Sequence, residues 1–206
     1  MKAYLFTGWA FPDAALRPLT NALGFSIAST HEEADIWIGW SLGGLHALAQ
    51  TDAKTPLVLI SSTARFCGNG ANWPGLPPAN LRALQRQVSR TPEEAMRGFH
   101  RLCASDAASD DEIESRVQES LRLELSTGLR DLAALDLRAQ LPSIHTPVLL
   151  VHGARDRVIP VEAARATAAL LPNATLHEHP TAGHDLPLTE VDWIAKRIAD
   201  FLDSPS

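Results

Sequence analysis

Short apolar runs recur along the chain and predict the strands of a buried, parallel sheet. They occupy residues 2–6, 36–40, 56–61 and 147–152, and residues 174–179 form a further, more polar extended stretch. Runs of this length between turn-forming residues are typical of strands covered on both faces. Residues 25–28 are a candidate for one more short strand. The segment 30–34 that follows is shorter than the dozen or more residues expected of a parallel crossover, so we expect a sheet reduced at its N-terminal end.

A long stretch of helical periodicity separates the strand at 56–61 from the strand at 147–152. It predicts helices at 78–89, 92–104, 110–127 and 129–135, with Thr91 and Ser109 as N-caps and Gly128 as a stop signal. A final amphipathic helix is predicted over 190–202. We therefore expect a core formed by residues 1–64 and 136–206, with residues 65–135 inserted as a helical cap.

Ser41 stands between a predicted strand and a predicted helix, within the pattern Gly39-x-Ser41-x-Gly43. A strand that delivers a serine onto a sharp turn needs glycines at these positions, because the neighbouring chain comes too close for a side chain. Ser41 is therefore the candidate nucleophile. The motif is short, and the alternative is an ordinary serine at a helix start.

A serine nucleophile needs a base to take its proton and an acid to orient that base. In this architecture the order along the chain is serine, acid, histidine. Asp156 follows the strand at 147–152 and is the candidate acid; His184 follows the strand at 174–179 and is the candidate base. Asp156 could instead be a turn former, His184 a packed or surface histidine, and Asp185 the acid.

Acyl transfer also requires N–H donors for the oxyanion. One should be the backbone N–H of Leu42, directly after the nucleophile, and the second should come from the loop after the first strand. Trp9 lies in that loop and is the candidate second donor, while its indole could also form a wall of the acyl pocket. A metal site at His177 and His179 is disfavoured, because no Cys or acidic pair accompanies these two histidines.

These motifs together resemble those of the α/β-hydrolases, and within them the chain is similar to the pimeloyl-[acyl-carrier protein] methyl ester esterases of biotin synthesis. The matching segments are Gly8-Trp9-Ala10, residues 39–45, Ser61-Ser62, Trp73-Pro74-Gly75, Asp136-Leu137-Arg138, residues 153–156 and Gly183-His184.

The resemblance implies an α/β-hydrolase fold with a helical cap and a cofactor-independent serine carboxylesterase acting on a pimeloyl methyl ester held by acyl carrier protein. Two departures stand out. Thr7 replaces the histidine usual before the oxyanion glycine, a change we expect a backbone donor to tolerate. The connection from the first strand to Ser41 is also short.

Composition agrees with a compact enzyme. The 206 residues, 45% hydrophobic and 20% charged, are enough for one domain with a sizeable core. The chain carries no apolar segment of membrane-spanning length and no signal-peptide pattern, so we expect a cytoplasmic protein with no membrane partner. Its two cysteines, Cys67 and Cys103, form no disulfide framework, and the net charge of −6 argues against nucleic acid as a partner.

Arginines in the predicted cap are the clue to a partner. Helical spacing places Arg82, Arg86 and Arg90 on one stripe, and Arg97 and Arg101 on another. Such stripes could bind an acidic carrier protein or could be solvated helix faces. Nearby acidic side chains weaken the docking interpretation, namely Asp106, Asp110, Asp111, Glu112 and Glu114. Two other functions stay open: a broad small-ester esterase or thioesterase, and a non-catalytic interaction protein on a hydrolase scaffold.

Overall fold

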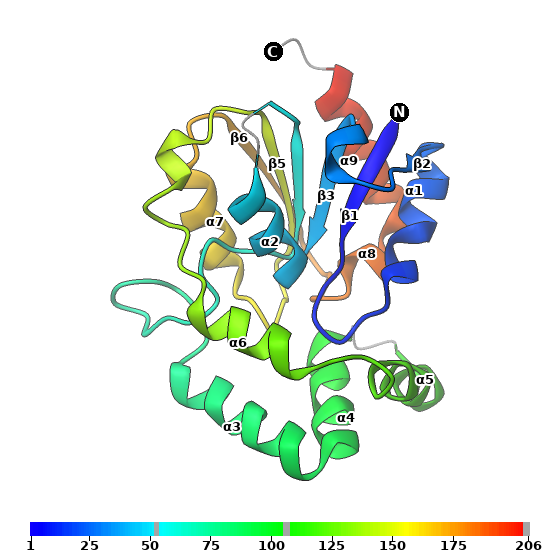
Figure 1. The fold of residues 1–206 in the computed structure, drawn as a ribbon, viewed down its shortest axis with the longest axis vertical. Helices are drawn as coiled ribbons and strands as arrows, with labels where there is room; N and C mark the ends of the chain where they lie inside the picture. The colour runs from blue at the N-terminus through cyan, green and yellow to red at the C-terminus, as the bar shows by residue number, and fades with distance from the viewer. Residues whose placement is uncertain (52–53, 105–107, 204–206) are drawn as a thin grey trace.

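A computed structural model describes residues 1–51, 54–104 and 108–203. Their strands form one sheet of six, in the order β2-β1-β3-β4-β5-β6, and every neighbouring pair is parallel (Figure 1). The strands are β1 (Lys2–Phe6), β2 (Ser26–Ile27), β3 (Ile36–Trp40), β4 (Leu57–Ile60), β5 (Val148–Gly153) and β6 (Ala174–His179). Strands β3, β4 and β5 are buried along their whole length, as their unbroken apolar sequences predict.

Helices cover both faces of the sheet. Helix α2 (Leu42–Gln50) packs on β1, β3 and β4 in front of the sheet, and α7 (Val161–Leu170) packs on β5 and β6 (Figure 1). Helix α9 (Val191–Asp203) lies behind the sheet beside α1 (Arg17–Leu23), and α8 (Leu186–Thr189) precedes it. Ile194 and Ile198 of α9 are fully buried, in line with the amphipathic pattern of this segment.

The connection from β2 to β3 differs from the expectation for a parallel crossover. β2 pairs with one side of β1 and β3 with the other, so residues 28–35 cross β1 with only a 3-10 turn, His31–Glu33. The judgement that this segment was too brief was wrong. To pass one strand, the chain must move sideways by about 10 Å. Because β2 has only two residues, the chain has little distance to return along the sheet before β3 begins, and residues 28–35 are long enough for both.

Four helices between β4 and β5 lie together beyond the carboxyl ends of the strands (Figure 1). They are α3 (Pro78–Arg90), α4 (Pro92–Cys103), α5 (Asp110–Ser120) and α6 (Ser126–Ala134). Thr91 is the N-cap residue of α4 but accepts no capping hydrogen bond with its side chain, whereas Ser109 forms a complete capping box with Glu112. None of the described helices has the length and apolar content to span a membrane.

The prediction of one helix over 110–127, stopped by Gly128, was wrong. The chain leaves the helix after Ser120, and a new helix begins at Ser126, because the Glu124 carboxylate accepts the free N–H groups of Ser126 and Thr127 at 2.9 Å each. Gly128 lies inside α6. A Cβ there would come within 2.5 Å of the Trp9 ring, so this glycine permits close packing and does not end a helix.

Candidate active site

Ser41 sits on a sharp turn between β3 and α2. Its φ of 56° and ψ of −119° are strained values for a residue with a side chain. Glycines make the turn possible: a Cβ on Gly39 would lie 2.6 Å from the Gly44 Cα, and one on Gly43 would lie 1.9 Å from the Phe6 carbonyl oxygen. The Ser62 hydroxyl donates to the Ser41 carbonyl at 2.7 Å and fixes the turn from the neighbouring strand end.

Three side chains from three strand ends meet at this turn. His184 Nε2 lies 3.0 Å from Ser41 Oγ, and His184 Nδ1 lies 2.8 Å from Asp156 Oδ2. Asp156 accepts and cannot donate when ionised, so Nδ1 of His184 carries a proton and Nε2 is left to accept one from the serine. All three residues are buried, with Ser41 only 6% exposed. The structure therefore brings the predicted serine, acid and histidine into one connected chain of hydrogen bonds.

Asp156 is held as a carboxylate by donors on both of its oxygens. Oδ1 accepts the backbone N–H groups of Val158 at 2.8 Å and Ile159 at 2.9 Å. Oδ2 is shared between His184 and His152, whose Nε2 lies 3.2 Å away. Burial alone would raise the pKa of Asp156, but the charge of His184 and the hydrogen bonds from His152 and His184 outweigh it and place the pKa below its usual range.

His152 is the contact that sequence reasoning missed. Its Nε2 also lies 2.9 Å from the Ile159 carbonyl oxygen, so it donates within the acid loop. The available signal was its spacing, because a histidine near the end of a buried strand and four residues before the acid can reach that acid around the turn.

The loop that carries His184 is fixed by backbone contacts. The Trp40 indole N–H donates to the His184 carbonyl at 3.1 Å. Gly153 lets this loop approach, since a Cβ there would lie 2.3 Å from the Ala182 carbonyl oxygen. The histidine ring is thus oriented from both its backbone and its Nδ1.

Asp185, the alternative acid, points elsewhere. It is fully buried, and its Oδ2 accepts from Arg116 Nη1 of α5 at 3.0 Å. Burial raises the pKa of Asp185, and Arg116 offsets only part of that rise. His179 is likewise engaged locally, because its Nδ1 accepts the N–H of Ala182. The geometry selects Asp156 over Asp185 as the partner of His184.

The loop after β1 lies directly against Ser41. A Cβ on Gly8 would be 3.4 Å from the Ser41 Cβ, which places the Trp9 backbone beside the serine. Leu42 begins α2, so its N–H belongs to the first turn of the helix, where N–H groups lack intrahelical acceptors. Trp9 and Leu42 border the same pocket, of about 260 Å³. The hydroxyl of Thr7, the residue before Gly8, donates to Asp13 at 2.8 Å.

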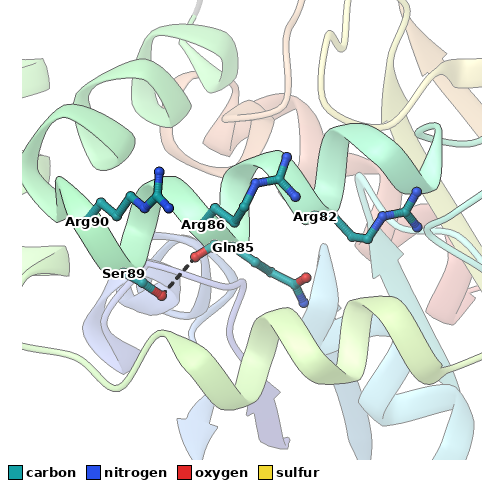
Figure 2. Close-up of a pocket in the computed structure, with 5 residues that line it drawn as sticks. All are labelled: Arg82, Gln85, Arg86, Ser89 and Arg90. Atoms are coloured by element: carbon teal, nitrogen blue, oxygen red, sulfur yellow. Dashed lines mark hydrogen bonds between the residues drawn. The ribbon is translucent and has the colours of Figure 1, made fainter.

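The predicted arginine stripes differ in their surroundings. Arg82, Arg86 and Arg90 of α3 line a shallow surface depression of about 380 Å³ with Gln85 and Ser89, and Figure 2 shows the three guanidinium groups along one side of the helix. None of these three arginines forms an ion pair with another described residue.

The second stripe is neutralised within the protein. Arg97 pairs with Glu93 and Glu114, both at 2.8 Å, and Arg101 pairs with Asp110 at 3.4 Å. Asp106, one of the acidic residues weighed against docking, lies outside the described residues.

Comparison with known proteins places the chain by sequence. Residues 5–197 match the alpha/beta hydrolase family. A pimeloyl-[acyl-carrier protein] methyl ester esterase from Photobacterium profundum is 33% identical over 178 residues, covering 81% of this chain and 69% of the relative. The protein of the same name from Xanthomonas oryzae pv. oryzae is 33% identical over 184 residues, covering 82% of this chain and 71% of the relative.

Solved structures share the fold at low sequence identity. An esterase from Exiguobacterium antarcticum aligns with a TM-score of 0.88 at 16% identity, covering 99% of this chain and 92% of that one. A bromoperoxidase from Bacillus anthracis aligns at 0.84 and 16% identity, covering 98% and 92%. Their different activities show that the likeness concerns architecture alone. The sheet order, the strained serine after β3 and the sequence match lead to one conclusion: this chain belongs to the alpha/beta hydrolase family.

Proposed function

We propose that the protein is a serine carboxylesterase in which Ser41, His184 and Asp156 form the catalytic triad. The observation that carries the proposal is the buried relay from Ser41 Oγ to His184 Nε2 at 3.0 Å and from His184 Nδ1 to Asp156 at 2.8 Å. An alcohol is a poor nucleophile at neutral pH, and this relay supplies the base and the orienting acid that it needs.

The chemistry follows from the positions of these groups. Ser41 Oγ attacks the ester carbonyl carbon while its proton passes to His184 Nε2. The tetrahedral intermediate then expels the alcohol, which takes that proton from His184. Water next attacks the acyl-serine while giving a proton to His184. The second tetrahedral intermediate then expels Ser41 Oγ, which takes that proton back from His184, and the acid is released. Asp156 keeps its charge and stabilises the imidazolium formed in both steps.

The backbone N–H groups of Trp9 and Leu42 are the proposed oxyanion donors. Trp9 follows Gly8, whose backbone lies against Ser41, and the Leu42 N–H stands at the positive end of α2. Loss of one such donor typically lowers kcat by about 10²–10³. The Trp9 indole donates to the Leu125 carbonyl at 2.9 Å, so the same residue also contacts the inserted helices.

We propose residues 65–135 as a cap that closes over this site. Gly128 of α6 lies on Trp9 and Leu42, and His46 of α2 contacts Asp131 of α6 at 3.0 Å. A cap in this position would hold the acyl chain and shield the site from bulk solvent while still admitting the water that hydrolyses the acyl-serine.

The proposed substrate is a pimeloyl methyl ester carried by acyl carrier protein. Two observations support it: the names of relatives about one third identical, and the α3 arginines, which pair with no carboxylate in the part of the chain that the structure describes. A carrier protein is acidic, and a basic stripe on an otherwise acidic protein gives it a place to dock. Arg82 and Arg86 are the stronger candidates of those selected from the sequence, since Arg97 and Arg101 already pair internally.

The triad is tested with purified protein and a chromogenic acyl ester. Ser41→Ala should lower kcat by several orders of magnitude and abolish labelling by a fluorophosphonate probe, because the triad acts as a unit. Folded wild type that neither hydrolyses the ester nor takes the label would point instead to a non-catalytic interaction protein.

The carrier is tested with two charge-reversed pairs. Arg82→Glu with Arg86→Glu should raise KM for the carrier-bound ester while leaving a small free ester unaffected; Arg97→Glu with Arg101→Glu is the matched control and should have the weaker effect. Equal turnover of free and carrier-bound esters, unchanged by either pair, would favour the broad small-ester esterase or thioesterase. Complementation of a strain unable to demethylate the pimeloyl ester, with wild type but not Ser41→Ala, tests the pathway.

A further inference from the structure

A buried polar network joins α4 and α5 to the loop after β1. His100 of α4 and Ser120, the last residue of α5, are both fully buried, and His100 Nε2 lies 2.7 Å from Ser120 Oγ. Ser120 Oγ in turn lies 2.6 Å from the carbonyl oxygen of Ala10 and 2.8 Å from that of Arg116. The triad uses none of these groups.

The direction of each hydrogen bond follows from counting protons. Two carbonyl oxygens face the Ser120 hydroxyl, and a carbonyl only accepts, so the single hydroxyl proton goes to them. The contact with His100 therefore has Nε2–H as donor and Ser120 Oγ as acceptor. The Ser120 hydroxyl is therefore buried and already donates its proton to backbone carbonyls. This excludes Ser120 as a second nucleophile activated by His100.

His100 is kept neutral in this position. Burial, assisted by the charge of Arg116, lowers the pKa of His100 to about 4. Its other nitrogen, Nδ1, is buried without a hydrogen-bond partner among the described residues. Burying an unpaired nitrogen costs stability, and an aromatic ring without nitrogens would avoid that cost. The feature of His100 that this position requires is therefore the Nε2–H that donates to the Ser120 hydroxyl.

The acceptor of the Ser120 proton belongs to a strained residue. Ala10 has a φ of 64°, in the left-handed region that a non-glycine residue adopts only when its surroundings hold it there. It follows Trp9, whose N–H is a proposed oxyanion donor and whose indole donates to the Leu125 carbonyl. Two hydrogen bonds therefore fix the loop on either side of the Trp9–Ala10 peptide. One joins the Trp9 indole to Leu125, in the segment between α5 and α6, and the other joins Ser120 of α5 to the Ala10 carbonyl.

We infer that Ser120, held by His100, is a positioning residue for the oxyanion donor on the loop after β1. The inference rests on the proposed esterase function and extends it, because it makes the oxyanion hole depend on α4 and α5 as well as on the sharp turn at Ser41. Ser120 touches no reacting atom. Its hydroxyl keeps the Ala10 carbonyl turned toward α5, and through the shared backbone it sets the direction of the Trp9 N–H.

The experiment compares Ser120→Ala with Thr167→Val in hydrolysis of a chromogenic ester. Thr167 is an equally buried hydroxyl whose hydrogen bonds lie in the core, to Ala163 and Ala64. Both variants lose a buried hydroxyl and should melt at a lower Tm. Only Ser120→Ala should lower kcat, by about tenfold or more, with KM nearly unchanged. Its inhibition constant for an alkyl trifluoromethyl ketone, which forms a tetrahedral adduct on the serine, should rise by a similar factor.

A second pair, His100→Phe and His100→Gln, keeps the test decisive if Ser120→Ala does not fold. Glutamine restores an N–H near the Nε2 position and should recover kcat, whereas phenylalanine should not. The inference is overturned if folded Ser120→Ala keeps wild-type kcat and ketone affinity, or if both His100 variants behave alike. Failure of the esterase proposal looks different, because wild type itself would then be inactive or Ser41→Ala would retain turnover.

Discussion

Replacing Asp156 with asparagine reverses the proton arrangement of the proposed triad. The two backbone N–H groups of Val158 and Ile159 keep the amide oxygen at the Oδ1 position, so the amide nitrogen takes the place of Oδ2. An NH₂ group there donates to His184 Nδ1, which must then be the unprotonated nitrogen. The proton moves to Nε2 and faces Ser41 Oγ, where a free lone pair is needed.

The magnitude follows from what is lost and what remains. A wrong tautomer at a serine hydrolase triad lowers kcat about 10⁴-fold, equivalent to roughly 5.5 kcal/mol of transition-state stabilisation. The backbone oxyanion donors and the pocket are untouched, so turnover should stay above the uncatalysed rate and KM should change little. The assay is steady-state hydrolysis of a chromogenic ester at pH 7.5 to 8, with near-native Tm confirming the fold.

Asp185→Asn is the matched control. It removes a buried carboxylate one residue from His184, but the amide oxygen can still accept from Arg116, and the triad is unaltered. We expect kcat to fall by less than about tenfold. Asp156→Asn with kcat within tenfold of wild type, or a loss near 10⁴ in Asp185→Asn instead, would refute the assignment of the acid.

Three further outcomes are expected. The pKa of histidine is near 6.5 in the unfolded state and about 4 for folded His100, so between these pH values only the unfolded state binds the proton. The contribution of His100 to the free energy of unfolding should therefore be complete above pH 6.5 and fall by roughly 3 kcal/mol toward pH 4. Urea titrations should show a smaller decline in His100→Phe. Gly43→Ala should prevent folding because its Cβ would overlap the β1 backbone, whereas Gly98→Ala on α4, with nothing within 4 Å of the new Cβ, should raise the free energy of unfolding by about 1 kcal/mol in urea titrations. Added NaCl should raise KM for the carrier-bound ester and leave a small free ester unchanged; equal salt responses would count against docking at Arg82 and Arg86.

The strands and the meeting of Ser41, Asp156 and His184 could be predicted from the sequence for a local reason. A strand buried on both faces is a continuous apolar run, and Ser41 and Asp156 come just after such runs, while His184 follows the more polar edge strand β6 by five residues. The short crossover into β3 was misjudged because a general length for parallel connections was applied to a case where only one strand is skipped and β2 has two residues.

The inserted helices were predicted less well because their boundaries depend on distant contacts. Periodicity continues past Ser120, and nothing nearby shows that this hydroxyl reaches Ala10, 110 residues earlier. Gly128 has the appearance of a helix stop, but its role is set by the Trp9 ring. For the arginines, the Glu93 partner of Arg97 is visible as an i,i+4 pair, whereas Glu114 is brought in only by the packing of α5 on α4.

Helix α5 touches both sides of the candidate site through residues one helical turn apart. Arg116 donates to Asp185, the residue after His184, and the Ser120 hydroxyl donates to the carbonyl of Ala10, the residue after Trp9. A helix is stiff over such a distance, so a small rotation or slide of α5 would disturb proton transfer and charge stabilisation together. Substitutions on the outer surface of α5 should therefore change proton transfer and oxyanion stabilisation together, without altering any group that contacts the substrate.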